Sequence, residues 1–323
     1  MRTNGLIGAA ATAVLLSMTA RTAAAQQPRL VLLPKQASGG TLTLVTLDRI
    51  TRAGDSIVSV TGTMAGEPLH FRDAQGGRMQ ALGAVPVDVS DSMVARVRVE
   101  HASGAVDTAR LFVKYPHHAP PPPVVAQQSR PRVRARGRRL SVDKKFTQRM
   151  DDSTEARIEK ENATAREIGR KAQDTPQLWT LPFLKPRPTK VTSKFGSGRV
   201  FNGRVASSHL GVDYRGREGE PIVAANRGVV ALVAEFFLAG NVVYIDHGDG
   251  VVTGYFHMSK PEVAVGDTVE RGQEIGLVGA TGRVTGPHLH WSARFGSLTI
   301  DPSNLFGLKA PFVSGIPIRK DGQ

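Results

Sequence analysis

A run of four prolines at residues 120–123 divides this chain of 323 residues. Such a run is stiff and extended, and it cannot take part in a packed core. A basic stretch that begins at Arg130 and ends at Arg139 follows closely. We therefore predict a Pro/Arg-rich linker over residues 116–142, with a separately folded part of the chain on either side.

The part before the linker has the pattern of β structure. Short runs that alternate apolar and polar residues occur at 41–45, 56–60 and 94–99, and turn-like segments separate them. Several short strands at this spacing favour a small antiparallel sandwich of the immunoglobulin-like kind. We predict this β-sandwich over residues 26–115. We expect a binding or spacer role for it, because its histidines, His70 and His101, are isolated surface or strand residues.

The part after the linker begins with a charged, alanine-containing segment that is free of proline from residue 143 to residue 173. This segment predicts an exposed helical bridge over residues 143–177. From residue 178 to residue 310 the chain is rich in Gly and Val. Strand-like runs occur there at 221–225, 228–233, 241–245 and 274–278. Gly-containing turns separate these runs. The pattern predicts a second, all-β domain, followed by a tail at 311–323, so the fold as a whole is expected to be mainly β.

The first 25 residues have the order of a secretory signal peptide. Arg2 precedes an apolar run without acidic residues, and three alanines at 23–25 fit a cleavage signal. The run is short for a membrane span, and an uncleaved signal anchor is the alternative. We expect an exported protein of the periplasm or cell envelope, or a secreted one, with no transmembrane segment after signal cleavage.

The absence of cysteine and the net charge of +14 limit the possible chemistry. Without cysteine, a metal would have to be bound by histidines and carboxylates. Removal of the signal, with Arg2 and Arg21, leaves a net charge of +12, which suits an anionic partner. Export argues against nucleic acid. We expect an anionic envelope surface contact through the arginines from Arg130 to Arg139, with a merely solvated linker as the alternative.

Five of the nine histidines lie in the second β domain, and two of them, His288 and His290, are two residues apart. Residues i and i+2 point to the same face of a strand, whereas on a helix they diverge. Gly286 and Pro287 disfavour a helix, and Trp291 favours a strand. We therefore predict that one strand presents both imidazoles side by side, as half of a metal site or an acid–base site.

His209 and Asp213 are a second candidate pair, four residues apart. In a straight strand their side chains would share a face but lie about 13 Å apart, which is too far for one ion. Shared binding therefore requires either a bend, for which Gly211 is a natural place, or a position for His209 in the loop before the strand.

The two pairs together contain enough ligands for a metal. Two histidines and one aspartate are an adequate set for catalytic zinc, which keeps a fourth position for water. A remaining imidazole could then act as a general base. The candidates for this base are His257 and whichever of His288 and His290 is not a ligand, and spacing alone does not assign the roles.

Ordered segments of the second domain resemble the lysostaphin/LytM-type zinc endopeptidases, which cut peptidoglycan peptides. The resemblance covers about residues 180–310. The segments are Phe-Gly at 195–196, Arg-Val-Phe-Asn-Gly at 199–203, His-Leu-Gly-Val-Asp at 209–213, Asp-His-Gly at 246–248, Tyr-Phe-His at 255–257, Gly-Ala-Thr-Gly at 279–282 and Gly-Pro-His-Leu-His-Trp at 286–291.

The resemblance implies a compact β domain that holds one zinc ion, Zn2+, and hydrolyses peptide cross-links of bacterial peptidoglycan. It implies that His209, Asp213 and His290 are the metal ligands. It also implies that His288 is a catalytic base and that His257 is a second catalytic histidine.

Two further residues and two alternatives belong to this interpretation. Tyr255 is expected near the site, where it could assist, and His247 matches a structural turn histidine. Some relatives that have lost ligands act as regulators of cell-wall amidases, so a non-catalytic regulator or wall-binding protein is the alternative function. The scissile bond stays open between D-alanyl–diaminopimelate cross-links and glycine bridges.

Overall fold

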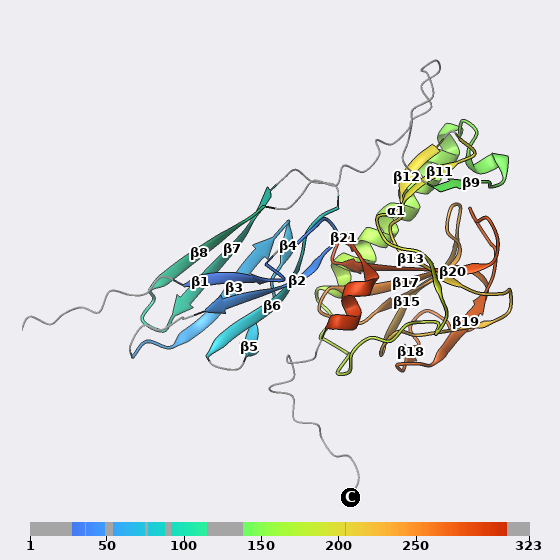
Figure 1. Cartoon of the computed structure of the whole chain (residues 1–323). Coiled ribbons are helices and arrows are strands. Elements are labelled where there is room, and N and C mark those ends of the chain that lie inside the picture. The colour runs from blue at the N-terminus through green and yellow to red at the C-terminus, as the bar shows by residue number, and fades with distance from the viewer. Residues whose placement is uncertain are drawn as a thin grey trace, which may run out of the picture.

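The fold is described from a computed structural model that defines residues 28–35, 37–48, 54–74, 77–87, 92–114, 138–203 and 205–308. The predicted signal peptide, most of the predicted linker and its arginines, and the predicted tail lie outside the described residues. Figure 1 shows a β-sandwich beside a larger β domain. Within the described ranges, no helix has the length and apolar character needed to cross a membrane.

In the described part of the N-terminal region, two four-stranded antiparallel sheets pack into a sandwich. One sheet has the order β1 (Arg29–Leu33), β2 (Leu42–Asp48), β6 (Arg78–Ala84), β5 (Arg72–Ala74). The other has the order β4 (Glu67–Pro68), β3 (Ile57–Met64), β7 (Ser92–His101), β8 (Val106–Lys114). Side chains of both sheets, among them Leu47 and Val99, form one buried core. The predicted sandwich is therefore present, while its immunoglobulin-like kind stays a prediction.

Strand β7 shows why this sequence forms a sandwich. Val97 and Val99 are buried, whereas Arg96 and Arg98 between and before them are exposed. Because successive side chains of a strand point to opposite faces, this alternation buries one face of the sheet and solvates the other.

The chain enters the C-terminal domain as a strand. Strand β9 (Arg138–Leu140) pairs in parallel with β11 (Gly198–Phe201), which pairs with β12 (Val205–Ser208). The last part of the predicted linker, residues 138–140, is therefore paired with the domain, because backbone groups at the edge of β11 form hydrogen bonds with β9. The short 3₁₀-helix η1 (Lys144–Phe146) and the helix α1 (Asp152–Ala172) follow, within the predicted helical bridge.

A ten-stranded sheet forms the body of the C-terminal domain as far as the structure describes it. The main path has the order β10-β13-β20-β17-β16-β15-β18, to which β14, β19 and β21 are attached. The bounds are β10 (Val191–Ser193), β13 (Val212–Arg215), β14 (Pro221–Val223), β15 (Gly228–Phe236), β16 (Gly240–Asp246), β17 (Val251–Pro261), β18 (Thr268–Val269), β19 (Glu274–Val278), β20 (His288–Phe295) and β21 (Leu298–Ile300), and the 3₁₀-helix η2 (Pro302–Gly307) follows. This arrangement confirms the predicted all-β domain.

The sandwich packs directly on the C-terminal domain. Leu42, Leu82 and Ala84, from β2 and β6, belong to the same buried cluster as Trp291 and Leu305 of the C-terminal domain. Burial of apolar side chains from both parts stabilises the contact between them.

Buried polar side chains fix the orientation of this contact. Glu67 of β4 accepts hydrogen bonds from the Ser297 backbone N–H at 2.9 Å and from Gln173 Nε2 at 3.1 Å. Arg72 of β5 binds both carboxylate oxygens of Asp249, at 2.9 and 3.2 Å. His70, expected to be an ordinary surface or strand residue, lies at this interface and is hydrogen-bonded to Gln173 at 3.1 Å.

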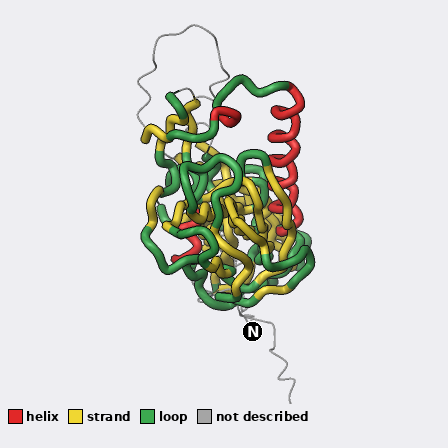
Figure 2. Tube along the Cα trace, turned by 90° about the vertical axis from the view of Figure 1, so that its right-hand side faces the viewer, coloured by secondary structure: helices red, strands yellow, loops and turns green. Residues whose placement is uncertain are grey.

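Helix α1 lies along one side of the C-terminal domain (Figure 2). Its buried residues Ala165 and Ala172 share a cluster with Val242 and Val252 of the sheet. Gly169 lies against the turn between β20 and β21, where a Cβ atom at this position would overlap the carbonyl oxygen of Gly296. The small side chains on this face of α1 thus allow the helix to approach the sheet closely.

We predict that Gly169→Ala destabilises the protein. Ala is normally favoured over Gly inside a helix by about 0.5–1 kcal/mol. Here the added methyl group forces the helix away from the turn, at a cost of about 1–3 kcal/mol. The matched control is Asn162→Ala, because Asn162 is an exposed residue of the same helix. Thermal unfolding followed by circular dichroism should show a lower midpoint for Gly169→Ala only; a rise for both variants would contradict the packing.

Candidate metal centre

The pairing of β13 with β20 brings together residues that are far apart in the sequence. In this antiparallel ladder Asp213 lies directly opposite His290, and Arg215 lies opposite His288. His288 and His290 occupy positions i and i+2 of β20, as predicted, and the rings of both lie near the ring of His257, with centroids 5.0 and 5.9 Å away. One strand therefore supplies two imidazoles to one place.

His209 reaches the same place from a loop. It lies between β12 and β13, and its backbone N–H donates to the carbonyl of Ser197 at 3.0 Å. Of the two possibilities left by the sequence, the loop position is the one observed. Gly211 permits it, because a Cβ atom there would lie only 2.5 Å from Nε2 of His290.

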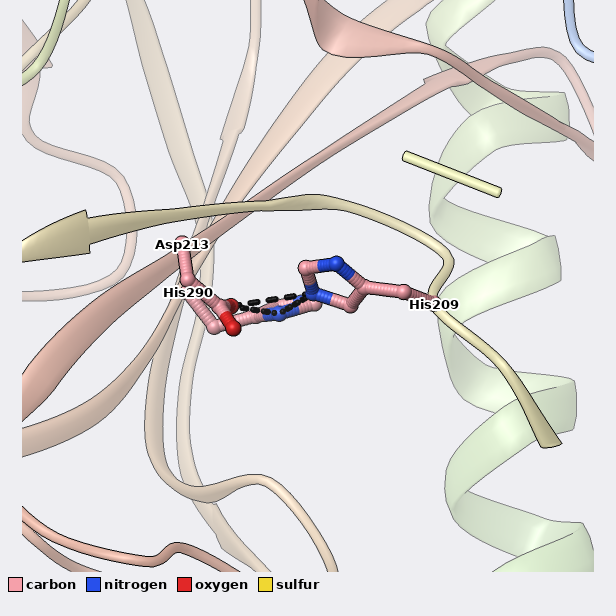
Figure 3. A group of neighbouring side chains, drawn as sticks. All are labelled: His209, Asp213 and His290. Atoms are coloured by element: carbon pink, nitrogen blue, oxygen red, sulfur yellow. Dashed lines mark hydrogen bonds and ion pairs between the residues drawn. The ribbon is translucent and has the colours of Figure 1, made fainter. Parts of the chain in front are cut away.

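Three ligand atoms converge in this arrangement (Figure 3). Nε2 of His209, Oδ1 of Asp213 and Nδ1 of His290 are separated by 2.9 Å in each pair. In a tetrahedral zinc site with bonds of about 2.0–2.1 Å, ligand atoms lie about 3.4 Å apart. A shift of about 0.5 Å would therefore admit the ion, and the donor set of two imidazoles and one carboxylate fits zinc.

The surroundings hold two of these groups in orientations that suit a metal. Nδ1 of His209 donates to the backbone carbonyl of Lys194 at 2.9 Å, so Nε2 presents its lone pair to the site. Arg199 forms an ion pair with Oδ2 of Asp213, which leaves Oδ1 directed at the two histidines. Such contacts orient ligands and fix their protonation.

The protonation states of the buried groups also suit a cation. Burial acts to raise the pKa of Asp213, but the contacts of its carboxylate with the imidazoles of His209 and His290 outweigh burial and hold that pKa well below its usual range. Burial lowers the pKa of His290 to about 4, against the opposing effect of Asp213. At neutral pH the aspartate is therefore ionised and His290 is neutral, which are the forms that bind metals.

His257 enters the site through an unusual backbone conformation. Its φ of 63° lies in the left-handed region, which is uncommon for residues other than glycine. The conformation breaks the alternation of β17, so that two consecutive residues face the site. The ring of Phe256 stacks on the ring of His290 with 5.2 Å between the centroids, and the ring centroid of His257 lies 5.0 Å from that of His288. Strained conformations of this kind cluster at functional sites.

Backbone carbonyls fix the tautomers of His257 and His288. Nδ1 of His257 donates to the carbonyl of Thr281 at 2.8 Å, and Nδ1 of His288 donates to the carbonyl of Gly286 at 2.8 Å. A carbonyl only accepts, so in the neutral rings Nε2 is left as an acceptor. Nε2 of His288 lies 3.7 Å from Oδ1 of Asp213, beside the three converging atoms.

Two other residues of the matching segments lie outside the site. The expectation that Tyr255 assists is wrong: its side chain is fully buried, and its hydroxyl contacts the backbone N–H of Ala225 at 2.8 Å and Thr253 Oγ1 at 3.0 Å. The alternation of β17 directs Tyr255 into the core. His247 is buried in a turn between the carbonyl of Arg227 and the hydroxyl of Thr253, at 2.7 and 2.8 Å, which agrees with a structural role.

Sequence reasoning missed the residues that support the ligands. It gave no role to Arg199, which pairs with Asp213, or to Phe256, which stacks on His290. A signal for Phe256 was present, because it directly precedes His257, but strand alternation alone would place the two on opposite faces.

The segment that contains the site is similar to known proteins. Residues 207–302 match peptidase family M23. Peptidoglycan DD-endopeptidase ShyA of Vibrio cholerae is 38% identical over 136 residues, which are 42% of this chain and 31% of ShyA. DD-carboxypeptidase/endopeptidase Mpg of Neisseria meningitidis is 39% identical over 114 residues, 35% of this chain and 26% of Mpg. The match thus spans about a third or less of the length of each of these curated relatives.

A solved structure extends the likeness beyond the matched domain. A crystal structure from Pseudomonas aeruginosa that carries the name peptidase M23 superposes with a TM-score of 0.59 and 25% sequence identity. The superposition covers 84% of this chain and 95% of the other. The likeness therefore includes more than the C-terminal β domain.

We predict that Arg199→Met weakens metal binding by about 10- to 100-fold, because Asp213 loses the partner that orients it. Arg215→Met is the matched control, since Arg215 is an exposed residue of the strand that carries Asp213. Competition with a chromogenic chelator at pH 7 measures the zinc affinity. Equal affinities for the two variants would show that Arg199 does not support the ligand.

We predict that His247 makes the folded protein less stable in acid. Burial lowers its pKa to about 4 from 6.5, so between these values the unfolded chain binds a proton that the folded chain does not. Stability then falls as pH falls, by up to about 1.4 kcal/mol per pH unit. Urea unfolding between pH 6.5 and 4.5 measures the free energy of unfolding. This free energy should depend less steeply on pH in His247→Gln than in the wild-type protein, and an equal slope in both would contradict the assignment.

Proposed function

We propose that this chain, which carries a peptidase family M23 domain at residues 207–302, is an exported zinc endopeptidase that hydrolyses peptide cross-links of peptidoglycan. The observation that carries the proposal is the convergence of His209, Asp213 and His290 on one point, with two further imidazoles beside it. The names of ShyA and Mpg support the substrate.

In this proposal His209, Asp213 and His290 hold the metal. Bound zinc would supply Lewis acidity, which polarises the carbonyl of the scissile amide and makes water more acidic. The residues around the metal supply the remaining functions, and we assign different functions to His257 and His288.

His288 is the group to which we assign the proton. Its Nε2 is a free acceptor beside the ligands, and its side chain is 16% exposed, so that it can reach both water and substrate. It takes the proton of the attacking water and returns a proton to the leaving amine, as a general base and then a general acid.

His257 is the group to which we assign the positioning of water. Burial lowers its pKa well below the usual value, and repulsion from His288 and His290 adds to this effect. A histidine that resists protonation keeps Nε2 as an acceptor, which can hold a water molecule by its hydrogen. In this proposal His257 therefore orients the water molecule, while His288 transfers the proton.

Export and the wall partner complete the proposal. The predicted signal peptide over residues 1–25 would bring the protein to the compartment that contains peptidoglycan. The positive net charge suits an anionic wall polymer, and the arginines from Arg130 to Arg139 are the proposed contact.

We predict different defects for two neighbouring histidines. His290→Ala should lose both zinc and activity, because it removes a ligand. His288→Ala should keep its zinc but lower kcat on cross-linked muropeptides by roughly 10²- to 10⁴-fold, because it removes only the base. Metal analysis and chromatography of digested peptidoglycan measure the two effects, and each variant is the control for the other.

Two outcomes would contradict this assignment. Full activity of His290→Ala would exclude its role as a ligand. A well-folded, zinc-free wild-type protein that changes no muropeptide even after zinc is added would favour the non-catalytic regulator instead.

A further inference from the structure

Arg283 lies in the segment that anchors both proposed catalytic histidines. This segment, residues 279–287, connects β19 to β20. The carbonyl of Thr281, two residues before Arg283, accepts the hydrogen bond of His257, and the carbonyl of Gly286, three residues after it, accepts that of His288. The backbone of Arg283 is itself fixed, because its N–H donates to the carbonyl of Leu238 at 2.8 Å.

The guanidinium of Arg283 lies over the ring of Phe201, 4.3 Å from the ring centroid. Phe201 is two residues from Arg199 in β11, so both side chains leave the strand on the same face. Arg199 in turn is paired with Asp213, a proposed ligand of the metal. Arg283 is therefore connected to the metal centre through Phe201 and Arg199, and it is near enough to Arg199 for their charges to repel each other.

Arg283 has no anionic partner in the described part of the chain. Its guanidinium forms no hydrogen bond or ion pair there, and its one described contact is with Phe201. Burial lowers its pKa to about 10, and repulsion from Arg199 adds to the effect. Arg283 is only partly buried, so its side chain stays charged at neutral pH and is accessible to a ligand.

Two other arginines of the same domain, Arg187 and Arg199, each have a carboxylate partner, which Arg283 lacks among the described residues. Arg187 binds Glu220 and the carbonyl of Pro221. Arg294 binds the carbonyl of Ser297, although its Nε has no hydrogen-bond partner among the described residues. If Arg283 served only to pack on Phe201, an uncharged side chain could do the same.

We propose that Arg283 determines specificity by binding a carboxylate of the substrate, on the residue whose amine is released. The proposal rests on the function proposed above and sharpens it. In a D-alanyl–diaminopimelate cross-link, the carbon attached to the scissile nitrogen also bears a free carboxylate. The interior of a glycine bridge has none. A guanidinium without an anionic partner, in the segment that anchors both proposed catalytic histidines, matches the first chemistry, because a guanidinium binds carboxylates with paired, charge-assisted hydrogen bonds.

The test compares two synthetic cross-linked peptides that differ at one group. One carries the free carboxylate next to the scissile amide, and the other carries a carboxamide in its place. Binding is measured by calorimetry with zinc-loaded, full-length His288→Ala protein, so that no turnover is required. We expect the carboxylate peptide to bind about 10- to 100-fold more tightly, which corresponds to one charge-assisted hydrogen-bonded pair.

Variants in the same background show whether Arg283 causes this preference. Arg283→Gln should bind both peptides with the affinity that the parent has for the carboxamide, and Arg283→Lys should restore part of the preference. Arg227→Gln is the matched control, because Arg227 is an exposed arginine whose ion pair with Glu270 lies elsewhere. Zinc content and circular dichroism verify that each variant is folded.

The outcomes separate this proposal from the proposed function. The role of Arg283 would be overturned if the His288→Ala parent bound the two peptides with equal affinity. It would also be overturned if Arg283→Gln lowered the affinity for both peptides by the same factor. Preference for the carboxylate together with no cleavage by the wild-type protein would support Arg283 and contradict the endopeptidase function. Cleavage of both peptides by the wild-type enzyme at the same kcat/KM would leave the function standing and refute the specificity.

Discussion

The antiparallel register between β13 and β20 is the constraint on which the rest of the site depends. It sets Asp213 opposite His290, and a slip by one residue would turn every side chain of one strand to the other face. The register is held by a core of large buried residues on both strands, including Tyr214, Leu289 and Trp291. Hydrophobic packing thus fixes the distance between the side chains of Asp213 and His290.

Around this ladder, each further group is positioned by backbone atoms or by charge. The carbonyls of Lys194, Thr281 and Gly286 each receive a histidine Nδ1, which sets three tautomers without any titratable partner. Positive charge gathers beside them in Arg199 and Arg283. A site with fixed acceptor nitrogens facing inward and cations at its side suits a metal, and we propose that it also binds an anionic peptide.

Much of this arrangement follows from the sequence, and the remainder has specific physical causes. The i, i+2 spacing of His288 and His290 was sufficient to predict their shared face, because strand periodicity is local. The loop position of His209 and the left-handed backbone of His257 depend on contacts distant in the sequence. Periodicity therefore left the position of His209 open and gave no sign of the backbone conformation of His257. The docking of the sandwich through Glu67 and Arg72 was also beyond reach, since neither residue belongs to a recognisable motif.

We propose that one zinc ion is bound by His209, Asp213 and His290, while His288 lies beside it. Anomalous diffraction at the zinc absorption edge, from crystals of the full chain with zinc, tests this most directly. We predict one strong peak within about 2.0–2.2 Å of Nε2 of His209, Oδ1 of Asp213 and Nδ1 of His290. A peak bonded to His288 in place of one of these residues, or no peak at this position, would contradict it.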